Sequence, residues 1–382
     1  MKIIPTEKWP IKMWLDEIED GALEQAKNLA RLPFLHQWVA IMPDAHQGFG
    51  MPIGGVIACK GHVIPNAVGV DIGCGMCAVR TTLKTVSPNK LQNILNHLKS
   101  VIPTGFSHHK RKQDSKLMPK MVSFKDYVVV SRLFEEARDQ LGTLGGGNHF
   151  IEFQKGSDGY IWIMVHSGSR NFGKQVADYY NKLAIRLNCP PEVPKAWQLA
   201  HLPLDAKEGQ SYMKEMQYCV DFAFANRKLM MERIKEVFST FCPCSFGEMI
   251  NIAHNYAALE THYGQKVVVH RKGATQAFKG TIGIIPGSMG TPSYIVEGLG
   301  NEESFKSCSH GAGRKMGRKQ AIRTLKLSEE QKKMKQILGK PTSQRELEEA
   351  PGAYKDIEQV MNHQTDLVHI KVRLEPLAVI KG

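Results

Sequence analysis

The segment Ile161-Trp-Ile-Met-Val-His166-Ser-Gly-Ser-Arg170 contains the pattern that decides the fold, because an apolar run rich in β-branched residues stops at a glycine-containing turn. Such a run is typical of a buried strand bounded by turn residues. Comparable runs predict strands at residues 37–41, 127–130 and 266–269. Apolar residues at helical spacing predict helices at residues 23–32, 131–141 and 211–238. Strands interspersed with helices indicate a mixed α/β fold.

The composition is that of a folded protein. Of the 382 residues, 42% are hydrophobic and 23% are charged, which excludes disorder as the main state. We see neither an internal repeat nor a linker rich in Ser and Gly, so we expect one domain over residues 1–382. A proline-rich connection predicts a peripheral helical insert around residues 190–240, and the charged, helix-forming segment 328–350 is expected to pack on the outside.

Hydropathy and cysteine usage predict where the protein resides. No apolar run approaches the ~18 residues of a membrane span, and Pro, Lys and Glu interrupt the apolar residues near the N-terminus. We therefore expect neither a membrane-spanning segment nor a signal peptide. The eight cysteines are sparse and mostly stand singly among apolar residues, which favours a reducing compartment over a disulfide scaffold. The expected location is cytoplasmic.

The net charge predicts a polyanionic partner. The chain has 50 Lys and Arg against 37 Asp and Glu, a net charge of +13, and such an excess favours a nucleic acid or a nucleotide. Two basic patches, at residues 108–120 and 314–326, are candidates for contact with nucleic acid. Either can be an ordinary solvated surface, which is the favoured interpretation for the first patch, whereas a polynucleotide backbone is favoured as the partner of the second.

Histidine, cysteine and aspartate cluster in glycine-rich turns and beside predicted strands, where they suit metal binding. Asp71 and Cys74 lie three residues apart in such a turn, and His149 and His166 adjoin strands. These ligand types suit zinc, iron or manganese without choosing among them. The alternatives are that Cys74 is a small buried apolar residue and Asp71 forms the turn. His254 is a further candidate, although its neighbours also suit a helix.

Phosphate binding is the second chemical theme. Glycine-rich turns at residues 145–148, 286–290 and 310–313 can present successive backbone N–H groups to an anion. Arg170 and Arg314 offer bidentate donors for phosphate oxygens. His310, followed by Gly-Ala-Gly-Arg-Lys, can attack a phosphorus atom as a neutral imidazole and form a phosphoramidate. A histidine that binds phosphate without forming a bond fits the same pattern.

Taken in chain order, these clusters resemble the RtcB family of GTP-dependent RNA ligases. The resemblance spans essentially the whole chain, from Met42-Pro-Asp through Gly69-Val-Asp71-Ile-Gly-Cys74-Gly, Gly147-Asn148-His149-Phe-Ile-Glu152, His166-Ser-Gly-Ser-Arg170, Arg271-Lys-Gly-Ala274, Pro286-Gly-Ser-Met-Gly290 and His310-Gly-Ala-Gly-Arg314 to Lys381-Gly382. It implies a single α/β domain with layered β-sheets surrounded by helices, distinct from a Rossmann fold.

The resemblance also implies a site and a reaction. Two Mn²⁺ ions would share Cys74, with Asp71 and His149 on one ion and His166 and His254 on the other. His310 would accept GMP from GTP, pass it to an RNA 3′-phosphate, and the 5′-hydroxyl of a second RNA end would then displace it. A 2′,3′-cyclic phosphate would first be opened by water. The residues that resemble the nucleotide pocket are Asn148, Phe150, Glu152, Ser288, Ser293, Tyr354 and Lys381. Some family members use an archease-type activator.

Two rival functions share part of this pattern. A metal-dependent RNA end phosphatase or cyclic phosphodiesterase would use the metals without a histidine–GMP bond, and a non-catalytic RNA-binding protein would keep only the fold. The chain departs from the family pattern at Ala45, Cys77 and Asn171. None of these is a proposed ligand, so the departures bear on substrate preference.

Overall fold

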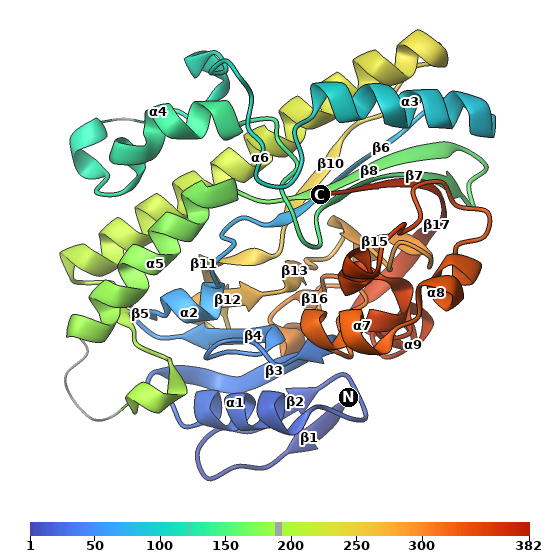
Figure 1. The fold of residues 1–382 in the computed structure, drawn as a ribbon. Coiled ribbons are helices and arrows are strands. Elements are labelled where there is room, and N and C mark those ends of the chain that lie inside the picture. Colours follow the sequence, from blue (N-terminus) through green and yellow to red (C-terminus); the bar gives the residue numbers. More distant parts are fainter. Residues whose placement is uncertain (122, 188–192) are drawn as a thin grey trace.

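Two large β-sheets form the centre of the computed structural model, which describes residues 1–121, 123–187 and 193–382 (Figure 1). The six-stranded sheet consists, in spatial order, of β1 (Lys2–Ile4), β2 (Ile11–Met13), β3 (Leu35–His46), β4 (Ile53–Cys59), β12 (Gln265–Lys272) and β11 (Asn255–His262). The seven-stranded sheet consists of β10 (Ile250–Ala253), β6 (Gly75–Arg80), β8 (Ile161–Ser167), β7 (Phe150–Gly156), β17 (Val368–Lys381), β15 (Ser293–Gly298) and β14 (Ile282–Ile285). Two-stranded sheets pair β13 (Ala274–Gln276) with β16 (Ser307–Ser309), and β5 (His62–Val63) with β9 (Leu202–Pro203).

The direction of strand pairing identifies the fold class. Among the described strands, β2 and β3 pair in parallel, and the other neighbouring pairs are antiparallel. A Rossmann fold needs a mostly parallel sheet built from helical crossovers. The predicted mixed α/β fold with layered sheets, distinct from a Rossmann fold, is therefore confirmed.

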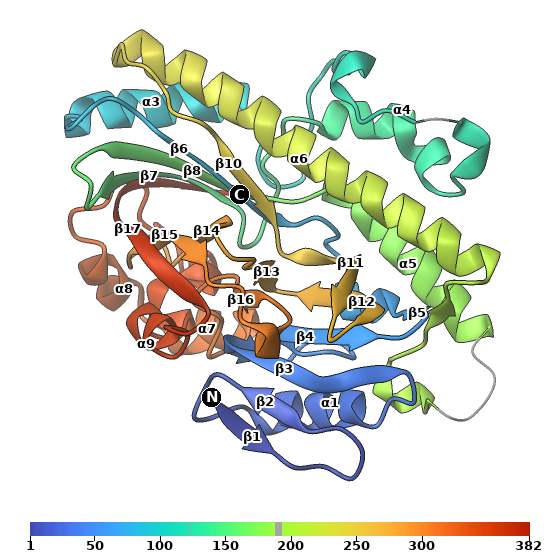
Figure 2. The same ribbon diagram turned by 180° about the vertical axis from the view of Figure 1, so that it is seen from behind.

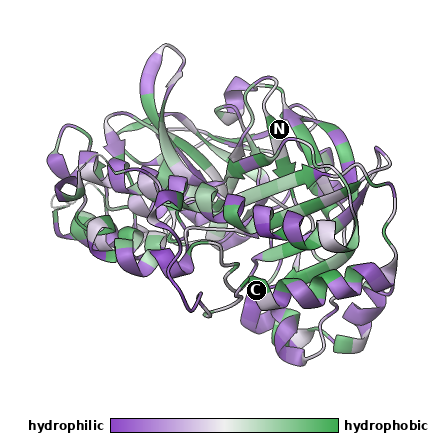
Figure 3. Ribbon diagram, turned by 90° about the horizontal axis from the view of Figure 1, so that it is seen from above, coloured by the Kyte–Doolittle hydropathy of each residue, from purple (hydrophilic) through white to green (hydrophobic). Residues whose placement is uncertain are grey.

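Helices surround the sheets on the outside. Two of them, α3 (Pro88–Val101) and α6 (Lys207–Phe241), lie along the seven-stranded sheet. Helix α5 (Arg170–Leu187) packs on α6, and α4 (Val130–Gln140) packs on α5. The others are α1 (Asp20–Ala30), α2 (Pro65–Val68), α7 (Arg318–Thr324), α8 (Leu327–Lys333) and α9 (Ile357–Asn362). Short 3₁₀ helices occur at η1 (Ser115–Leu117), η2 (Phe124–Asp126), η3 (Lys195–Trp197), η4 (Glu302–Ser304), η5 (Gln344–Glu349) and η6 (Pro351–Ala353). Figure 3 shows hydrophilic residues along these outer helices and hydrophobic residues on the strands between them.

Helix α6 connects two hydrophobic clusters. Its N-terminal half packs Tyr212, Met216 and Phe222 into a cluster with α5, and its C-terminal half packs Ile234 and Phe238 into a cluster with the seven-stranded sheet. Figure 2 shows the helix running along strand β10, and it contacts β6 and β8 as well. The division into one domain with an insert around residues 190–240 stays a prediction, and residues 189–192 of the proline-rich connection lie outside the described residues.

Most of the predicted elements form where the sequence placed them. The strands at 37–41, 161–165 and 266–269 lie within β3, β8 and β12, and the helices at 23–32, 131–141 and 211–238 correspond to α1, α4 and α6. Segment 328–350 is only partly helical, in α8 and η5, and it buries Glu330, Leu347 and Glu349. For these buried residues, the expectation that the segment packs on the outside is wrong.

The predicted strand at residues 127–130 is also wrong, because this apolar run leads into helix α4. The buried carboxylate of Glu215 accepts hydrogen bonds from the backbone N–H groups of Val128, Val129 and Val130, at 2.6 to 3.2 Å. The first N–H groups of a helix have no partner within the helix, so a carboxylate there stabilises the start of α4. In the described ranges, no helix has the length and hydropathy needed to cross a bilayer.

Candidate active site

Antiparallel pairing brings several chain segments to one edge of the seven-stranded sheet. Strand β6 starts at Gly75, which pairs with Ser167 at the end of β8 and with Ala253 at the end of β10. Strand β7 starts at Phe150, opposite Lys381 at the end of β17. The residues that adjoin these strand ends are therefore neighbours in space, although they are far apart in sequence.

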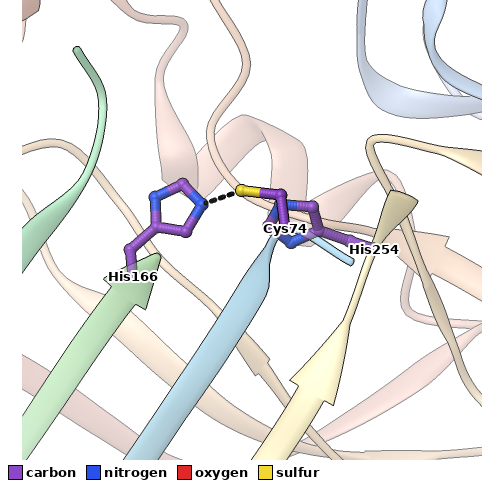
Figure 4. Close-up of side chains that lie close together, drawn as sticks. All are labelled: Cys74, His166 and His254. Atoms are coloured by element: carbon purple, nitrogen blue, oxygen red, sulfur yellow. Dashed lines mark hydrogen bonds between the residues drawn. The ribbon is translucent and has the colours of Figure 1, made fainter. Parts of the chain in front are cut away.

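The first group at this edge is Cys74, His166 and His254, whose ligand atoms all lie within 4.8 Å of one another. Figure 4 shows the three side chains converging from the ends of three neighbouring strands. The Cys74 Sγ lies 3.3 Å from Nε2 of His166, and the rings of His166 and His254 are 5.2 Å apart. All three residues are buried. His254 lies between strands β10 and β11, so the helical alternative for its segment is wrong.

The second group is Asp71, Cys74 and His149, and it shares the cysteine with the first. The His149 Nε2 lies 3.5 Å from the Cys74 Sγ and 3.2 Å from Oδ2 of Asp71. A thiolate can bridge two metal ions, and this sulfur belongs to both groups. The five predicted ligands therefore lie together in the structure, arranged as two overlapping groups around one sulfur.

Hydrogen bonds orient the imidazoles toward the sulfur. The Nδ1 of His149 lies 2.9 Å from the carbonyl oxygen of Leu144, and that of His166 lies 3.1 Å from the carbonyl oxygen of Asn148. A carbonyl oxygen only accepts hydrogen bonds, so we assign the proton to Nδ1, which leaves the lone pair on Nε2. Histidines that bind metals are commonly held in this way.

The donor set fits a divalent transition-metal ion. The Nδ1 of His254 is buried and has no hydrogen-bond partner among the described residues, and a bound ion would satisfy a free lone pair on this ring. Thiolate, imidazole and carboxylate together suit manganese, iron or zinc. The cluster can therefore hold metal, and the ligand types leave the identity of the metal open.

The electrostatics of the cluster agree with this interpretation. Burial holds the pKa of His166 and of His254 well below the ordinary value, so both rings are neutral ligands at pH 7. Burial acts to raise the pKa of Asp71, but the adjacent His149 ring and Cys74 thiol lower it to about 2. Burial and the Asp71 carboxylate raise the pKa of the Cys74 thiol, so a metal ion is needed to hold it as a thiolate.

Helix α6 supports this edge through two buried residues that the sequence reasoning missed. Arg227 donates from Nη1 to the carbonyl oxygens of Gly73 and Ser167, both at 2.9 Å. Asn226 donates to the carbonyl oxygen of Gly168 and accepts from the backbone of Gly142. Both residues thus bind loops that carry metal-ligand candidates. Cys77, three residues after Cys74, lies in a hydrophobic cluster. Its thiol is 3.8 Å from the carbonyl oxygen of Arg227.

His310 follows strand β16 and is held by Asp44 of strand β3. Its Nδ1 lies 2.5 Å from Oδ2 of the buried Asp44, and its backbone N–H donates to the same oxygen at 3.1 Å. The rings of His310 and His254 are 4.8 Å apart. Gly313 has a φ of +72°, and a Cβ there would lie 2.1 Å from the Asp44 carbonyl oxygen, so this close approach requires glycine. Asp44 belongs to the Met42-Pro-Asp motif, yet no pattern in the sequence indicated its contact with His310.

A cavity of about 170 Å³ adjoins His310. Six of the seven residues predicted for nucleotide binding line it: Asn148, Phe150, Glu152, Ser288, Tyr354 and Lys381. The seventh, Ser293, does not line it, and its hydroxyl instead accepts a hydrogen bond from the backbone of Gly287 at 3.2 Å. Residues from opposite ends of the chain thus meet in one cavity.

Charged groups are concentrated in this cavity. Burial raises the pKa of Glu152 to about 8 and lowers the pKa of Lys381, whose ammonium lies 5.5 Å from the centre of the Phe150 ring. Glu349 pairs with Arg314 at 2.9 Å and with Arg318 at 3.0 Å. The sequence reasoning missed Glu349, because it lies in the charged segment expected on the outside.

A larger groove of about 1660 Å³ shares Asn148, His310 and Arg314 with the small cavity. The second predicted basic patch lines this groove through Arg314, Arg318, Lys319 and Arg323. No residue of the first patch, 108–120, lines either cavity. Arg170 lies beside the metal-ligand candidates, with Nη1 3.5 Å from Nδ1 of His149.

Comparisons with known proteins agree with this geometry. The family model described as tRNA-splicing ligase RtcB matches residues 25–139 and 119–382. The chain is 37% identical to the RNA-splicing ligase RtcB of Escherichia coli strain K12, over 100% of this chain and 99% of that protein. It is 33% identical to the tRNA-splicing ligases RtcB of Pyrobaculum aerophilum, over 99% of this chain and 96% of that protein, and of Thermococcus kodakarensis, over 95% and 92%.

Proposed function

Because the chain belongs to the RtcB family of RNA-splicing ligases, we propose that it joins an RNA 3′-phosphate or 2′,3′-cyclic phosphate end to a 5′-hydroxyl end by way of a histidine–GMP intermediate. The role would be RNA repair or tRNA splicing. One observation carries the proposal: His310, fixed by Asp44, adjoins the metal-ligand cluster through His254 and lines both the small cavity and the groove.

The Asp44 contact suits His310 for nucleophilic attack. A carboxylate at Nδ1 accepts the proton there, which leaves the lone pair on Nε2 and stabilises the positive charge that the ring gains during attack. In the first step Nε2 bonds to the α-phosphorus of GTP and pyrophosphate leaves. The RNA 3′-phosphate then attacks the same phosphorus, which releases His310 and forms RNA-(3′)pp(5′)G. Finally, the 5′-hydroxyl attacks the RNA phosphorus and GMP leaves.

The metal part of the proposal assigns two Mn²⁺ ions to the two overlapping groups. Asp71 and His149 would hold one ion, His166 and His254 the other, and Cys74 both. When bound, such ions neutralise phosphate charge and lower the pKa of bound water. The three histidines are buried, which limits the water that can compete for their ring nitrogens.

The nucleotide part of the proposal assigns guanosine to the small cavity. Lys381 can donate to guanine O6, Glu152 offers a carboxyl group to the guanine edge, and Phe150 offers an aromatic ring. Arg314 would contact phosphate from the side that the small cavity shares with the groove. The groove, with its basic residues on α7, would receive RNA.

Labelled GTP tests the proposal directly. The protein is incubated with Mn²⁺ and GTP labelled at the α-phosphate, and we expect an acid-labile protein–GMP bond that peptide mapping places on His310. A His310→Ala variant of normal thermal stability should form no adduct and join no RNA ends. Removal of the terminal phosphate without any adduct would instead support the phosphatase or cyclic phosphodiesterase.

A further inference from the structure

Phe106 is an exposed aromatic residue to which the mechanism above gives no role. It lies between α3 and α4, and its side chain is fully exposed, which is unusual for a large apolar ring. The residues that flank it, Gly105 and Ser107, cover none of it. An exposed ring is a ready surface for stacking of an unpaired base.

The backbone next to Phe106 is fixed to the loop that leads to the metal-ligand candidates. Gly105 donates its N–H to the carbonyl oxygen of Gly145 at 2.8 Å, and Leu144 donates to the carbonyl oxygen of Pro103 at 2.9 Å. Leu144 in turn accepts the hydrogen bond from His149 that orients its ring. Phe106 therefore projects from a short, anchored connection to the candidate metal centre.

Arg170 lies at the same place. Its Nη2 donates to the carbonyl oxygen of Gly105 at 3.4 Å, and a Cβ on Gly145, which has a φ of +91°, would lie 2.0 Å from its Nη1. Only glycine permits this approach. The guanidinium thus connects the base of the Phe106 loop with His149, and a strand that stacks on Phe106 would have its phosphates within reach of the site.

Cations follow Phe106 along the loop. Lys110 and Arg111 are exposed, and no carboxylate pairs with either of them in the part of the chain that the structure describes. The neighbouring Lys112 pairs with Glu135 at 3.0 Å, and the backbone N–H of His109 donates to the carbonyl oxygen of Asp139 at 3.0 Å. The loop is thereby fastened to helix α4, while two positive charges are left for another partner.

We propose that Phe106 stacks on an unpaired base of one of the two RNA ends, with Lys110 and Arg111 bound to the phosphates of that end. This inference rests on the proposed ligase function. Ligation brings two RNA ends to one site, and the basic groove offers a path for one of them. The Phe106 loop, which lies outside the groove, offers a path for the other. The unpaired cations beside the ring, and the hydrogen-bonded connection from its loop to the metal-ligand candidates, favour a nucleic-acid base over a membrane or an apolar protein face.

Substitutions of Phe106 separate stacking from mere apolar contact. We expect Phe106→Ala and Phe106→Leu to raise the KM for one RNA strand about 5-fold or more, while Phe106→Tyr stays within about 2-fold of the wild type, because tyrosine keeps the aromatic face. Leu259→Ala, which removes another exposed apolar side chain on strand β11, serves as the control and should change neither KM. An equal KM for Phe106→Leu and the wild type, for both strands, would overturn the proposal.

A mutant cycle identifies the base. RNA strands with one abasic position, placed in turn along each end, should lose the sensitivity to Phe106→Ala when the stacked base is missing. An unchanged mutational effect at every abasic position would contradict stacking. The GMP adduct on His310 is measured alongside and should form at the wild-type rate in the Phe106 variants. Absence of the adduct in the wild type would refute the proposed function, whereas a normal adduct with an unaltered KM refutes only the role of Phe106.

Discussion

The guanidinium of Arg227 donates to the carbonyl oxygen of Gly73, the residue before Cys74, at a distance of 2.9 Å. The same nitrogen donates to the carbonyl oxygen of Ser167, the residue after His166. One buried side chain of helix α6 therefore fixes the backbone on both sides of the candidate sulfur–imidazole contact.

Replacing Arg227 should weaken metal binding. In Arg227→Leu, two buried carbonyl groups lose a charged donor, which costs about 1 to 3 kcal/mol for each group, and the thiol and the imidazole lose their relative position. We expect at least a 10-fold weaker affinity for Mn²⁺ by calorimetry. Arg227→Lys, which keeps a charged donor, should lose less of the Mn²⁺ affinity than Arg227→Leu. Wild-type affinity in a folded Arg227→Leu protein would show that the helix plays no part in positioning the ligands.

Loss of the shared sulfur should abolish the metal centre. Cys74→Ala removes the atom common to both groups, so we expect neither ion to bind in its proper place and no GMP adduct to form. Cys77→Ala is the matched control, because its thiol is buried in a hydrophobic cluster and lies 3.8 Å from a backbone carbonyl oxygen of α6. This control should bind two equivalents of Mn²⁺ by elemental analysis. A normal adduct yield in Cys74→Ala would refute the bridging role.

Asp44→Asn should slow guanylylation with little effect on the fold. The amide has nearly the size of the carboxylate, but it neither fixes the proton on Nδ1 of His310 nor stabilises the charged ring. We expect adduct formation to slow about 100-fold or more in rapid-quench experiments. Asp16→Asn is the control, since Asp16 pairs with His363 at 3.0 Å on the surface. If both variants react at the wild-type rate, the contact is only structural.

His270 should make the protein sensitive to acid. Its Nε2 accepts from the backbone N–H of Ile64 at 2.9 Å, and burial lowers its pKa from 6.5 to about 4. Below pH 6.5 the unfolded chain therefore binds a proton on His270, whereas the folded protein binds this proton only below about pH 4. The contribution of the neutral His270 to the free energy of unfolding is fully present above pH 6.5. It falls by up to about 3 kcal/mol as the pH drops from 6.5 to 4. Urea unfolding should show a smaller loss between pH 7 and pH 4.5 in His270→Gln.

The sequence could predict the site's members because each of them adjoins a strand end or a glycine-rich turn. Antiparallel pairing then gathers Cys74, His149, His166 and His254 without any further signal. The residues that were missed act across long separations: Asp44 reaches His310 over 266 positions, and Glu349 reaches Arg314 from a segment that looked exposed. Local patterns carry no information about such contacts.

The apolar run at residues 127–130 shows a second limit. Periodicity cannot distinguish a short buried strand from the start of a buried helix. The deciding residue is Glu215, which lies more than 80 positions away and supplies the acceptors for the first N–H groups of α4. The tertiary partner, and not the local propensity, decides the structure of this run.

Helix α6 spans two hydrophobic clusters and holds the ligand-bearing loops at its middle through Asn226 and Arg227. Because both side chains belong to one continuous helix, local opening of this edge of the sheet should disturb both clusters. Backbone amides near Gly73 and Ser167 should accordingly exchange with deuterium as slowly as the most protected amides of the molecule. Turnover would then depend on the entry and exit of RNA at a rigid centre.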